Sequence, residues 1–375
     1  MTIRRFPQLA HWGAYTAVVE DGRLIRCEPH AADSDPSPML DSIIPLVYSD
    51  KRIRKPAVRR SWLQKREHSN RALRARRILS RLIGTWRWIW WRKRIAGCAT
   101  NMARRGFLLA PTAGRRRAFA PRSLAGAALL LYRRRRGGSG GNYSWGTAQF
   151  FLPYIIGTFT PLTGRVTTWP SVVDNAEILL AFGGLALKNA QVASGGAVAH
   201  TLKPALEQLA KKGTPIVNIS PMRDDCPEFA NAEWIPIRPN TDAALMMALA
   251  FEIQRVGAQD DAFLASHCVG YPQLAAYLQG KTDGVEKTPE WASQITGIPA
   301  ARIARLAQQL IGVRSFITCA YSVQRAHRGE QPYWMMIALS AMLGQVGLPG
   351  GGFSFGHGSM NGVGNPRFDT PGARR

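Results

Sequence analysis

Residues 177–319 alternate between short apolar runs and longer stretches of helical periodicity, and this alternation limits the fold more than any other feature of the sequence. The run at 177–182 enters a glycine pair at 183–184, which is typical of a buried strand followed by a tight turn. A stretch with leucines on one helical face follows at 201–212, and a second largely apolar run follows at 214–219. Strands that alternate with helices indicate βαβ units, so the sequence predicts an α/β fold with a mostly parallel sheet.

The same alternation continues toward the C-terminus. A short run at 234–237 predicts a third strand, residues 242–253 are again helical, and 316–318 opens a further strand. Ligands of such sheets bind beyond the carboxyl ends of the strands, where glycine turns and helix N-termini accept phosphate groups. The segments that we expect at this edge are 183–189, 220–223 and 240–242. No G-x-G-x-x-G motif follows these strands, so the usual nicotinamide or flavin fingerprint is absent from the sequence.

The chain is strongly basic, and the excess charge is concentrated in one window. Lys and Arg number 49 against 24 Asp and Glu, which gives a formal net charge of +25. Residues 75–140 contain 17 of the basic residues and no acidic residue, so this window carries +17 and the rest of the chain +8. It holds four tryptophans between 86 and 91 and an arginine run at 133–136, without sustained helical or strand periodicity.

Three interpretations of the basic window stay open. An arginine-rich arm would bind nucleic acid, with phosphates held by charge and bases stacked on tryptophan, and its affinity would fall steeply with salt. A disordered linker is the simpler alternative, although four tryptophans are unusually apolar for one. The third interpretation is that the window is translated out of frame, in which case it carries no selected packing pattern.

Composition and spacing exclude several other classes of protein. No apolar run reaches the roughly 18–20 residues that a membrane-spanning helix needs, so no membrane span is expected. The cysteines show no C-x-x-C spacing, which excludes a disulfide scaffold and a cysteine cluster; they are Cys27, Cys98, Cys226, Cys268 and Cys319. The run Arg4, Arg5 and Phe6 resembles a twin-arginine export signal, but no apolar segment follows it, so we expect a cytoplasmic location.

Seven short motifs flank the basic window in a fixed order. They are H-W-G-A-Y at 11–15, V-Y-S at 47–49, N-Y-S-W-G-T-A-Q at 142–149, L-K-N-A-Q at 187–191, R-P-N-T-D at 238–242, Q-R-A-H-R-G-E-Q at 324–331 and G-Q-V-G-L-P-G-G-G-F at 344–353. Together they resemble the molybdenum enzymes that reduce S-oxides and N-oxides, the dimethyl sulfoxide, trimethylamine N-oxide and biotin sulfoxide reductases. The resemblance covers about 300 residues, and its gap coincides with the basic window.

This resemblance implies a molybdenum bis(molybdopterin guanine dinucleotide) cofactor. Ser144 matches the position at which the family binds molybdenum through a serine oxygen, which makes it the expected metal ligand and catalytic residue. Such a hard oxygen ligand suits a high-valent metal that exchanges an oxo group. The residues that match cofactor contacts are Lys188, Asn189, Ile219, Ser220, Asn240, Thr241, Asp242, Tyr321, Ser322 and Arg325. Among these, the turn 240–242 corresponds to the guanine-reading turn, and Arg325 can pair with a phosphate through two N–H donors.

Taken singly, these residues also have ordinary structural interpretations. Ser144 fits a polar turn before a helix, and a lysine that follows a strand turn, such as Lys188, is usually solvated. The turn 240–242 fits a helix N-cap, and a cap and a ligand contact can coexist. Ser220 stands where the family often has a carboxylate, so its contact with the nucleotide stays open. Arg325 can equally have a structural role.

Two further features carry no firm assignment. The glycine run 350–352 is compatible with a close backbone approach to the cofactor or with a flexible turn. Three histidines lack metal-ligand spacing with cysteines or carboxylates, and we expect them not to be ligands. They are His200, His327 and His357.

The function that the resemblance implies is the reduction of a small-molecule S-oxide or N-oxide by oxygen-atom transfer. The candidate substrates are biotin or methionine sulfoxide, trimethylamine N-oxide and dimethyl sulfoxide, with electrons from a donor that the sequence does not identify. No iron–sulfur cluster is expected, because no cysteine cluster accompanies the N-terminal segment. No specific nucleic-acid partner is implied. The alternative function is that of a basic nucleic-acid-binding protein acting through residues 75–140.

We expect the chain to comprise three segments. These are a family-like N-terminal segment at 1–74, an anomalous basic segment at 75–141, and an α/β region at 142–375 that binds the molybdopterin dinucleotide. The family continues for a comparable length beyond Arg375, so we expect the sheet domain to be incomplete at its C-terminus. The family's G-S-Y-G-W motif, whose Tyr and Trp line the oxo site, is also missing from the translated chain. A fragment with half of the site is expected to be inactive.

The genetic code gives a test of the out-of-frame interpretation. If each original codon joins the last base of one present codon to the first two bases of the next, residues 83–91 can be reread as W-D-V-A-L-D-L-V. With permitted synonymous codons, residues 105–115 can be reread as R-I-L-A-G-S-Y-G-W-A. The family carries a helix that begins W-D-x-A-L-D and then G-S-Y-G-W, in this order and at about this distance.

We therefore predict that the gene has a frame slip near Arg74 that is restored before Asn142. Sequencing the gene should find codons that allow both rereadings, for example an isoleucine codon ending in T at Ile83. Codons in either stretch that exclude the rereading would contradict the frame slip.

Overall fold

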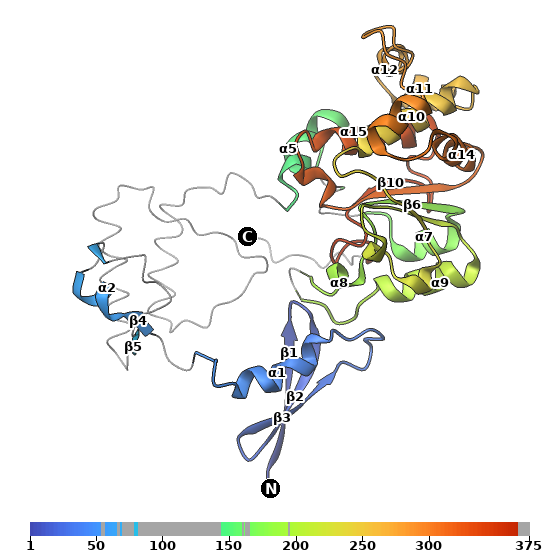
Figure 1. Ribbon diagram of the computed structural model, residues 1–375. Coiled ribbons are helices and arrows are strands. Elements are labelled where there is room, and N and C mark those ends of the chain that lie inside the picture. Colours follow the sequence, from blue (N-terminus) through green and yellow to red (C-terminus); the bar gives the residue numbers. More distant parts are fainter. Residues whose placement is uncertain are drawn as a thin grey trace. The chain divides into compact units, whose positions relative to one another are not determined.

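The computed structural model describes residues 1–53, 57–65, 68–69, 79–81, 144–159, 161, 166–193 and 196–366 (Figure 1). Most of the basic segment 75–141, including its tryptophans and its arginine run, lies outside these residues, as do the first two residues of the motif at 142–149. The chain divides into two units, which are residues 1–23, 28–40 and 141–375, and residues 24–27 and 41–140.

The N-terminal residues form short strands and helices. Strands β1 (Ile3–Ala10) and β2 (Gly13–Glu20) pair antiparallel, and β3 (Arg23–Pro29) follows through a two-residue turn. Asp21 and Gly22 occupy this turn with φ values of 44° and 82°, as the Asp-Gly pair of a tight hairpin does. The next elements are α1 (Met39–Tyr48), β4 (Ala57–Arg59), α2 (Arg60–Lys65) and β5 (Leu79–Arg81), with β4 and β5 antiparallel.

The larger part of the chain alternates helices with parallel strands. Its helices are α5 (Gly146–Ile156), α7 (Trp169–Asn175), α8 (Leu187–Ala190), α9 (Leu202–Lys212), α10 (Asp242–Arg255), α11 (Asp261–His267), α12 (Tyr271–Leu278), α13 (Pro289–Thr296), α14 (Ala300–Leu310) and α15 (Glu330–Met342). Its strands are β6 (Ile178–Phe182), β7 (Ile216–Ile219), β8 (Glu233–Ile235), β9 (Ser315–Cys319) and β10 (Gly352–Phe355). Short 3₁₀ turns are η3 (Arg223–Asp225), η4 (Glu228–Ala230) and η5 (Val323–Arg325).

Local sequence signals begin and end several of these helices. The Thr168 side chain accepts a hydrogen bond from the Ser171 N–H at 3.4 Å and caps α7, which has a proline in its first turn. The Thr288 side chain caps α13 in the same way. Helix α9 ends at Gly213, whose φ of 75° is easily reached only without a side chain.

The strands form one sheet in the order β10-β9-β6-β7-β8, and all neighbours are parallel. The predicted α/β fold with a parallel sheet is therefore confirmed, and four of its strands lie where the apolar runs predicted them. Strand β10 was not predicted, because a short G-F-S-F segment directly after three glycines resembles a turn.

Helices cover both faces of the sheet. Successive residues of β6 alternate between two cores: Leu180 and Phe182 belong to one, and Leu179 and Ala181 to the other. Helices α10, α14 and α15 pack over the first face, and α7 and α9 over the second (Figure 1). A strand buried on both faces needs apolar residues at every position, which explains the continuous apolar run of β6.

The strand order creates a topological switch point. From β6 the chain moves outward on one side through β7 and β8, and then returns to the other side of β6 to form β9 and β10. The segments that follow β6 and β9 therefore leave the sheet side by side and then diverge, which in α/β sheets opens a ligand-binding crevice at the carboxyl ends of the strands.

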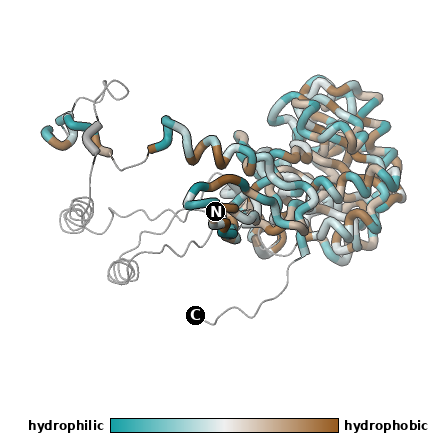
Figure 2. Tube along the Cα trace, turned by 90° about the horizontal axis from the view of Figure 1, so that it is seen from below, coloured by the Kyte–Doolittle hydropathy of each residue, from teal (hydrophilic) through white to brown (hydrophobic). Residues whose placement is uncertain are grey.

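Within the part of the chain that the structure describes, no helix has the length and apolarity needed to cross a membrane. In Figure 2, hydrophobic and hydrophilic residues interchange along the trace of the described residues, without a long uninterrupted hydrophobic stretch among them.

The centre of β6 should be a main source of stability. Leu180 is fully buried and lies opposite Val217 of β7 and Ile317 of β9. We predict that Leu180→Ala lowers the free energy of unfolding by about 2–5 kcal/mol, because it removes buried methyl groups and leaves a cavity. Chemical denaturation measures this change. Gln208→Ala on the exposed side of α9 is the control, with an expected change within about 0.5 kcal/mol, and equal effects of the two substitutions would contradict this core.

Candidate functional site

Ser144 lies just before α5, and the loop after β9 holds its backbone. The Gln324 side chain donates from Nε2 to the Ser144 carbonyl at 2.9 Å, and Arg325 Nε donates to the same oxygen at 3.4 Å. Trp145 packs edge-on against Tyr321, with ring centroids 5.6 Å apart. The structure thus brings together the expected metal ligand and the expected contacts of the late strand, which are about 180 residues apart in sequence. The Ser144 residue is exposed at this edge.

A glycine turn at the end of β6 lies between the segments that follow its two neighbouring strands. Gly183 and Gly184 have φ values of 81° and 78°. A Cβ on Gly183 would lie 2.9 Å from the Val323 side chain and 3.3 Å from the Ser322 hydroxyl. A Cβ on Gly184 would lie 2.5 Å from both the side chain and the carbonyl of Asp225. Both positions therefore require glycine, for backbone conformation and for space.

Lys188 and Asn189 lie in the short helix α8, and both are exposed. The Lys188 ammonium is 4.0 Å from the Asp225 carboxylate. At this separation and exposure the pair is a weak surface interaction, so Lys188 remains available to an anionic ligand.

Ile219 and Ser220 are both fully buried. The Ile219 side chain is part of the core, and its carbonyl accepts the N–H of Gly183 at 2.8 Å. The Ser220 hydroxyl donates to the Asp225 carboxylate at 2.6 Å, and its carbonyl accepts the Trp234 indole N–H at 2.9 Å. In this structure the two residues fix the glycine turn and the orientation of Asp225.

Asp225 is the residue that sequence reasoning missed. It follows β7 by six residues, and its carboxylate lies beside both Ser220 and Lys188. A polar acidic cluster directly after a buried parallel strand, here Asp224 and Asp225, was the available signal. Ser220 stands where the family often has a carboxylate, and the Asp225 carboxylate lies beside the Ser220 hydroxyl.

The turn 240–242 leads into α10 and ends in a buried carboxylate. Asn240 adopts a left-handed conformation with φ of 65°, and the Thr241 hydroxyl donates to the Arg238 carbonyl at 2.7 Å. Asp242 is the first residue of α10 and is 8% exposed. Burial raises the pKa of Asp242 to about 6, partly offset by a hydrogen bond to its own backbone. Burial raises the pKa of the Cys319 thiol at the carboxyl end of β9, and the charge of Asp242 raises it further. Asp242 follows the parallel strand β8, whose carboxyl end lies at the same edge of the sheet.

The residues at this edge include both cationic side chains and carboxylates. Lys188 and Arg325 are cations that can bind phosphate groups. Asp225 and Asp242 are carboxylates that accept hydrogen bonds from hydroxyl groups or from the N–H groups of a base. Such a set suits a ligand that carries anionic groups together with hydrogen-bond donors, as nucleotides do.

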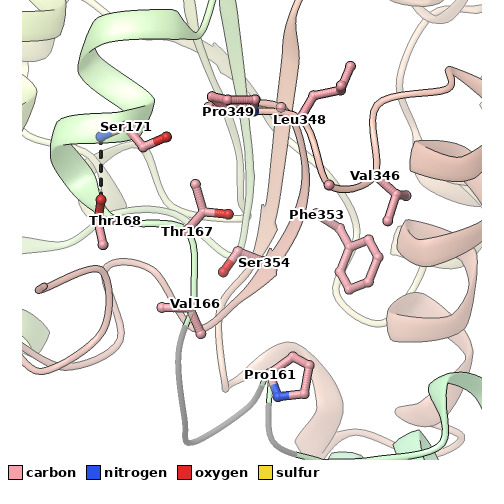
Figure 3. A pocket seen from close by; sticks show the side chains of 12 residues that line it. Pro161, Val166, Thr167, Thr168, Ser171, Val346, Leu348, Pro349, Phe353 and Ser354 are labelled. Atoms are coloured by element: carbon pink, nitrogen blue, oxygen red, sulfur yellow. Dashed lines mark hydrogen bonds between the residues drawn. The ribbon is translucent and has the colours of Figure 1, made fainter. Parts of the chain in front are cut away.

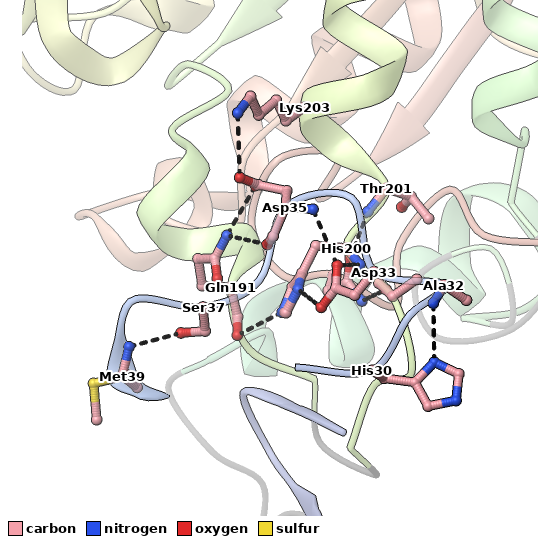
Figure 4. A network of polar contacts seen from close by, with 12 residues as sticks. His30, Ala32, Asp33, Asp35, Ser37, Met39, Gln191, His200, Thr201 and Lys203 are labelled. Carbon is pink, nitrogen blue, oxygen red and sulfur yellow. Dashed lines mark hydrogen bonds and ion pairs between the residues drawn. The ribbon is translucent and has the colours of Figure 1, made fainter. Parts of the chain in front are cut away.

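A network of buried polar groups supports the segment that follows α8 (Figure 4). The Asp33 carboxylate accepts hydrogen bonds from the backbone N–H of His200 at 3.0 Å and from its Nδ1 at 2.8 Å. The other ring nitrogen, Nε2, lies 3.2 Å from the Gln191 carbonyl, and the Gln191 side chain donates to Asp35 at 3.0 Å. Both ring nitrogens of His200 therefore lie against oxygen atoms, which ties the segment after α8 to the residues around Asp33.

The other two histidines named from the sequence have separate surroundings. His327 is exposed. His357 is fully buried, its Nε2 lies 2.9 Å from the Thr167 carbonyl, and burial lowers its pKa to about 4. Among the described residues, no group of three or more His, Cys, Asp or Glu side chains is arranged to hold a metal ion.

A pocket of about 440 Å³ lies elsewhere, between the start of α7 and β10 (Figure 3). Its lining residues include Val166, Thr167, Thr168, Ser171, Val346, Leu348, Phe353 and Ser354. None of the residues expected to bind a cofactor lines this pocket. The glycine run 350–352 adjoins it at the amino end of β10, where Gly350 packs on the Ser171 carbonyl and Gly352 on that of Gln345. These glycines permit close approach of the protein's own backbone.

Comparison with protein families gives two matches along the chain. A family model described as molybdopterin oxidoreductase N-terminal domain matches residues 8–48, and one described as molybdopterin oxidoreductase matches residues 139–367. Biotin sulfoxide reductase of Cereibacter sphaeroides is 38% identical over 348 residues, which are 90% of this chain and 46% of that protein. Dimethyl sulfoxide/trimethylamine N-oxide reductase of Rhodobacter capsulatus is 34% identical in an alignment 375 positions long, which covers 96% of this chain and 44% of that protein.

The chain thus spans about half the length of the curated relatives that it matches. Among solved structures, acetylene hydratase from Pelobacter acetylenicus superposes with a TM-score of 0.50 at 16% identity, over 92% of this chain and 44% of that one. At this identity the likeness supports the fold alone.

The buried Asp242 carboxylate should make stability depend on pH. Its pKa of about 6 in the folded chain exceeds the ordinary 3.8, so folding favours the protonated form. This contribution is complete below about pH 3.8 and is lost as the pH rises through about 6. We predict that Asp242→Asn raises the free energy of unfolding at pH 7.5 by about 2–3 kcal/mol and changes it little at pH 4. Denaturant titrations across this range, with the exposed Asp174→Asn as control, measure the effect, and a pH-independent difference would contradict it.

Proposed function

The chain belongs to the molybdopterin oxidoreductase family, and on this premise we propose that the carboxyl edge of its sheet binds a molybdenum–pterin cofactor in the guanine dinucleotide form. Family membership implies the molybdenum–pterin group itself. The dinucleotide form is our proposal, and it draws on the residues at the edge of the sheet.

The described residues fit a dinucleotide by their chemistry. Lys188 and Arg325 would bind its phosphates, since both are cations exposed at this edge. Asp225 would accept hydrogen bonds from ribose hydroxyls, and Asp242 from the N–H groups of guanine. The turn 183–184 lacks side chains where any Cβ would collide with Val323 or Asp225, so it lets the segments that carry Ser322 and Asp225 lie close together at this edge.

The observation that carries the proposal is the convergence of Ser144, Lys188, Asp242 and Arg325 on one edge of the sheet. We propose that Ser144 is the protein ligand of the metal. Its carbonyl is anchored by two side chains, which fixes the position of the residue, and the residue itself is exposed at this edge. When bound, the molybdenum group supplies two-electron oxygen-atom chemistry, and the protein's task is to bind and orient.

We propose that the substrate is a small S-oxide or N-oxide that is reduced by oxygen-atom transfer. The support is the identity of 31–38% to proteins named biotin sulfoxide, dimethyl sulfoxide and trimethylamine N-oxide reductase. The comparisons give no support to nucleic-acid binding by residues 75–140.

We also propose that the metal site contains no iron–sulfur cluster. Such clusters need several thiolates in reach of one another. Cys226 and Cys319 are buried, and burial raises the pKa of both thiols, that of Cys226 to about 12, which disfavours thiolate formation.

A frame slip within residues 75–141 accounts for the basic segment in this proposal, and it separates the N-terminal segment 1–74 from the region 142–375. The two family models match residues 8–48 and 139–367, and the segment between them is matched by neither. This gap, residues 49–138, contains both stretches in which the rereading restores the family's motifs.

The test is the molybdenum and guanine nucleotide content of the purified protein. We predict that the frame-restored chain, completed to the full length of the curated relatives and made in a host that synthesises the cofactor, contains molybdenum and releases guanine nucleotide on denaturation. Lys188→Ala should lower nucleotide retention about tenfold or more, because a charge-assisted hydrogen bond is lost. Lys211→Ala, at the exposed end of α9, is the matched control. A well-folded protein without molybdenum would overturn the proposal.

A further inference from the structure

Helix α5 begins without a cap from its own neighbourhood. Its N-cap residue, Trp145, makes no side-chain cap hydrogen bond. The first N–H groups of any helix lack partners within the helix and need an acceptor from elsewhere. For Ala148, in the first turn, this acceptor is Oε1 of Gln324 at 3.2 Å, from a residue 176 positions later in the chain.

The nitrogen of the Gln324 side-chain amide donates hydrogen bonds to two backbone carbonyls. Gln324 Nε2 donates to the Ser144 carbonyl at 2.9 Å and to the Tyr321 carbonyl at 3.1 Å. Gln324 is 1% exposed, and all of its principal donor and acceptor positions are thereby used. The opposite orientation of the amide would turn its oxygen toward two carbonyls, so these contacts also fix which end is nitrogen.

We propose that Gln324 is a positioning residue that sets the location of Ser144 relative to the carboxyl edge of the sheet. This inference rests on the proposed role of Ser144 as a metal ligand. The amide joins three backbone segments: the residue that would bind the metal, the first turn of α5, and the loop after β9 that also carries Arg325.

Two other contacts reach the same place, and neither can replace the amide. Arg325 donates to the Ser144 carbonyl over the longer distance of 3.4 Å and is exposed, so water competes for it. The edge-on contact of Trp145 with Tyr321 orients rings and satisfies no backbone group. Of the hydrogen bonds described here, those of Gln324 both cap α5 and bind the Ser144 carbonyl.

Two substitutions separate hydrogen bonding from the filling of space. Gln324→Leu keeps an apolar side chain of similar size but leaves the Ala148 N–H and two carbonyls without this partner. Gln324→Glu keeps the shape. A protonated carboxyl can accept from Ala148 and donate to one carbonyl, whereas an ionised carboxylate turns a charged oxygen toward both carbonyls. Its titratable neighbours are Arg325 and Tyr321, whose ordinary pKa values lie well above 8.

Hydrogen exchange of the amides in residues 145–150 gives the first readout. Compared with the unaltered chain at the same pH, Gln324→Leu should speed exchange there about tenfold or more, because buried hydrogen bonds are lost. At pH 5, Gln324→Glu should exchange more slowly than the leucine variant, because a protonated carboxyl can still accept from Ala148 and donate to one carbonyl. Gln208→Leu and Gln208→Glu, on the exposed face of α9, are the matched controls and should leave this segment unchanged.

Unchanged exchange in the leucine variant would overturn the proposal, because Gln324 would then act only by its volume. Exchange does not require bound cofactor, so these outcomes are independent of whether the proposed function is correct.

The second readout is molybdenum content after cofactor loading. Loss of a group that orients a metal ligand typically lowers metal affinity about tenfold or more. Gln324→Leu should show such a loss while Gln208→Leu does not. Faster exchange with full molybdenum retention would overturn the link between Gln324 and the metal. A chain that binds no molybdenum even without substitution would count against the proposed function and leave the exchange result standing.

Discussion

The parallel pairing of β6 with both β7 and β9 is the constraint on which the rest of the site depends. The register puts Phe182, the last residue of β6, opposite Ile219 and Cys319, the last residues of its neighbours, so all three chains leave the sheet at the same level. The backbone segments that follow β6, β7 and β9 therefore lie close together at the carboxyl edge of the sheet. The turn at 183–184 can pass only because it has no side chains, and this passage brings Asp225 and Ser322 to either side of it.

Polar groups at this edge differ in how their burial is compensated. Gln324 is buried with its hydrogen-bonding capacity filled, so it rigidifies the segments that it joins. Asp242 is buried with little more than its own backbone to stabilise its charge, which costs stability near neutral pH. A ligand with N–H donors would remove that cost, and such local destabilisation is typical of binding sites that are completed by their ligand.

Much of the fold followed from local sequence. The strands at 178–182 and 216–219 were predictable because both faces of the sheet are covered, which demands continuous apolar runs. Strand β10 was not predictable, because its sequence is glycine-rich and resembles a turn. Its pairing with β9 makes it a strand. The family followed from the order of short motifs, and the comparisons confirm it. At the candidate site, the roles of Ser144 and Lys188 stay predictions, while Asp225 was overlooked because its partner is the buried hydroxyl of Ser220.

By itself, the sequence determined the class of fold, the edge of the sheet at which polar residues gather, and the family, because apolar periodicity, glycine turns and motif order are local properties of the chain. Tertiary structure alone decided the partners: Gln324 with Ser144, and His200 with Asp33. These pairs are 180 and 167 residues apart, and no periodicity links them. Burial, too, is a property of the folded chain, so the raised pKa of Asp242 emerges only when helices and sheet exclude water around it.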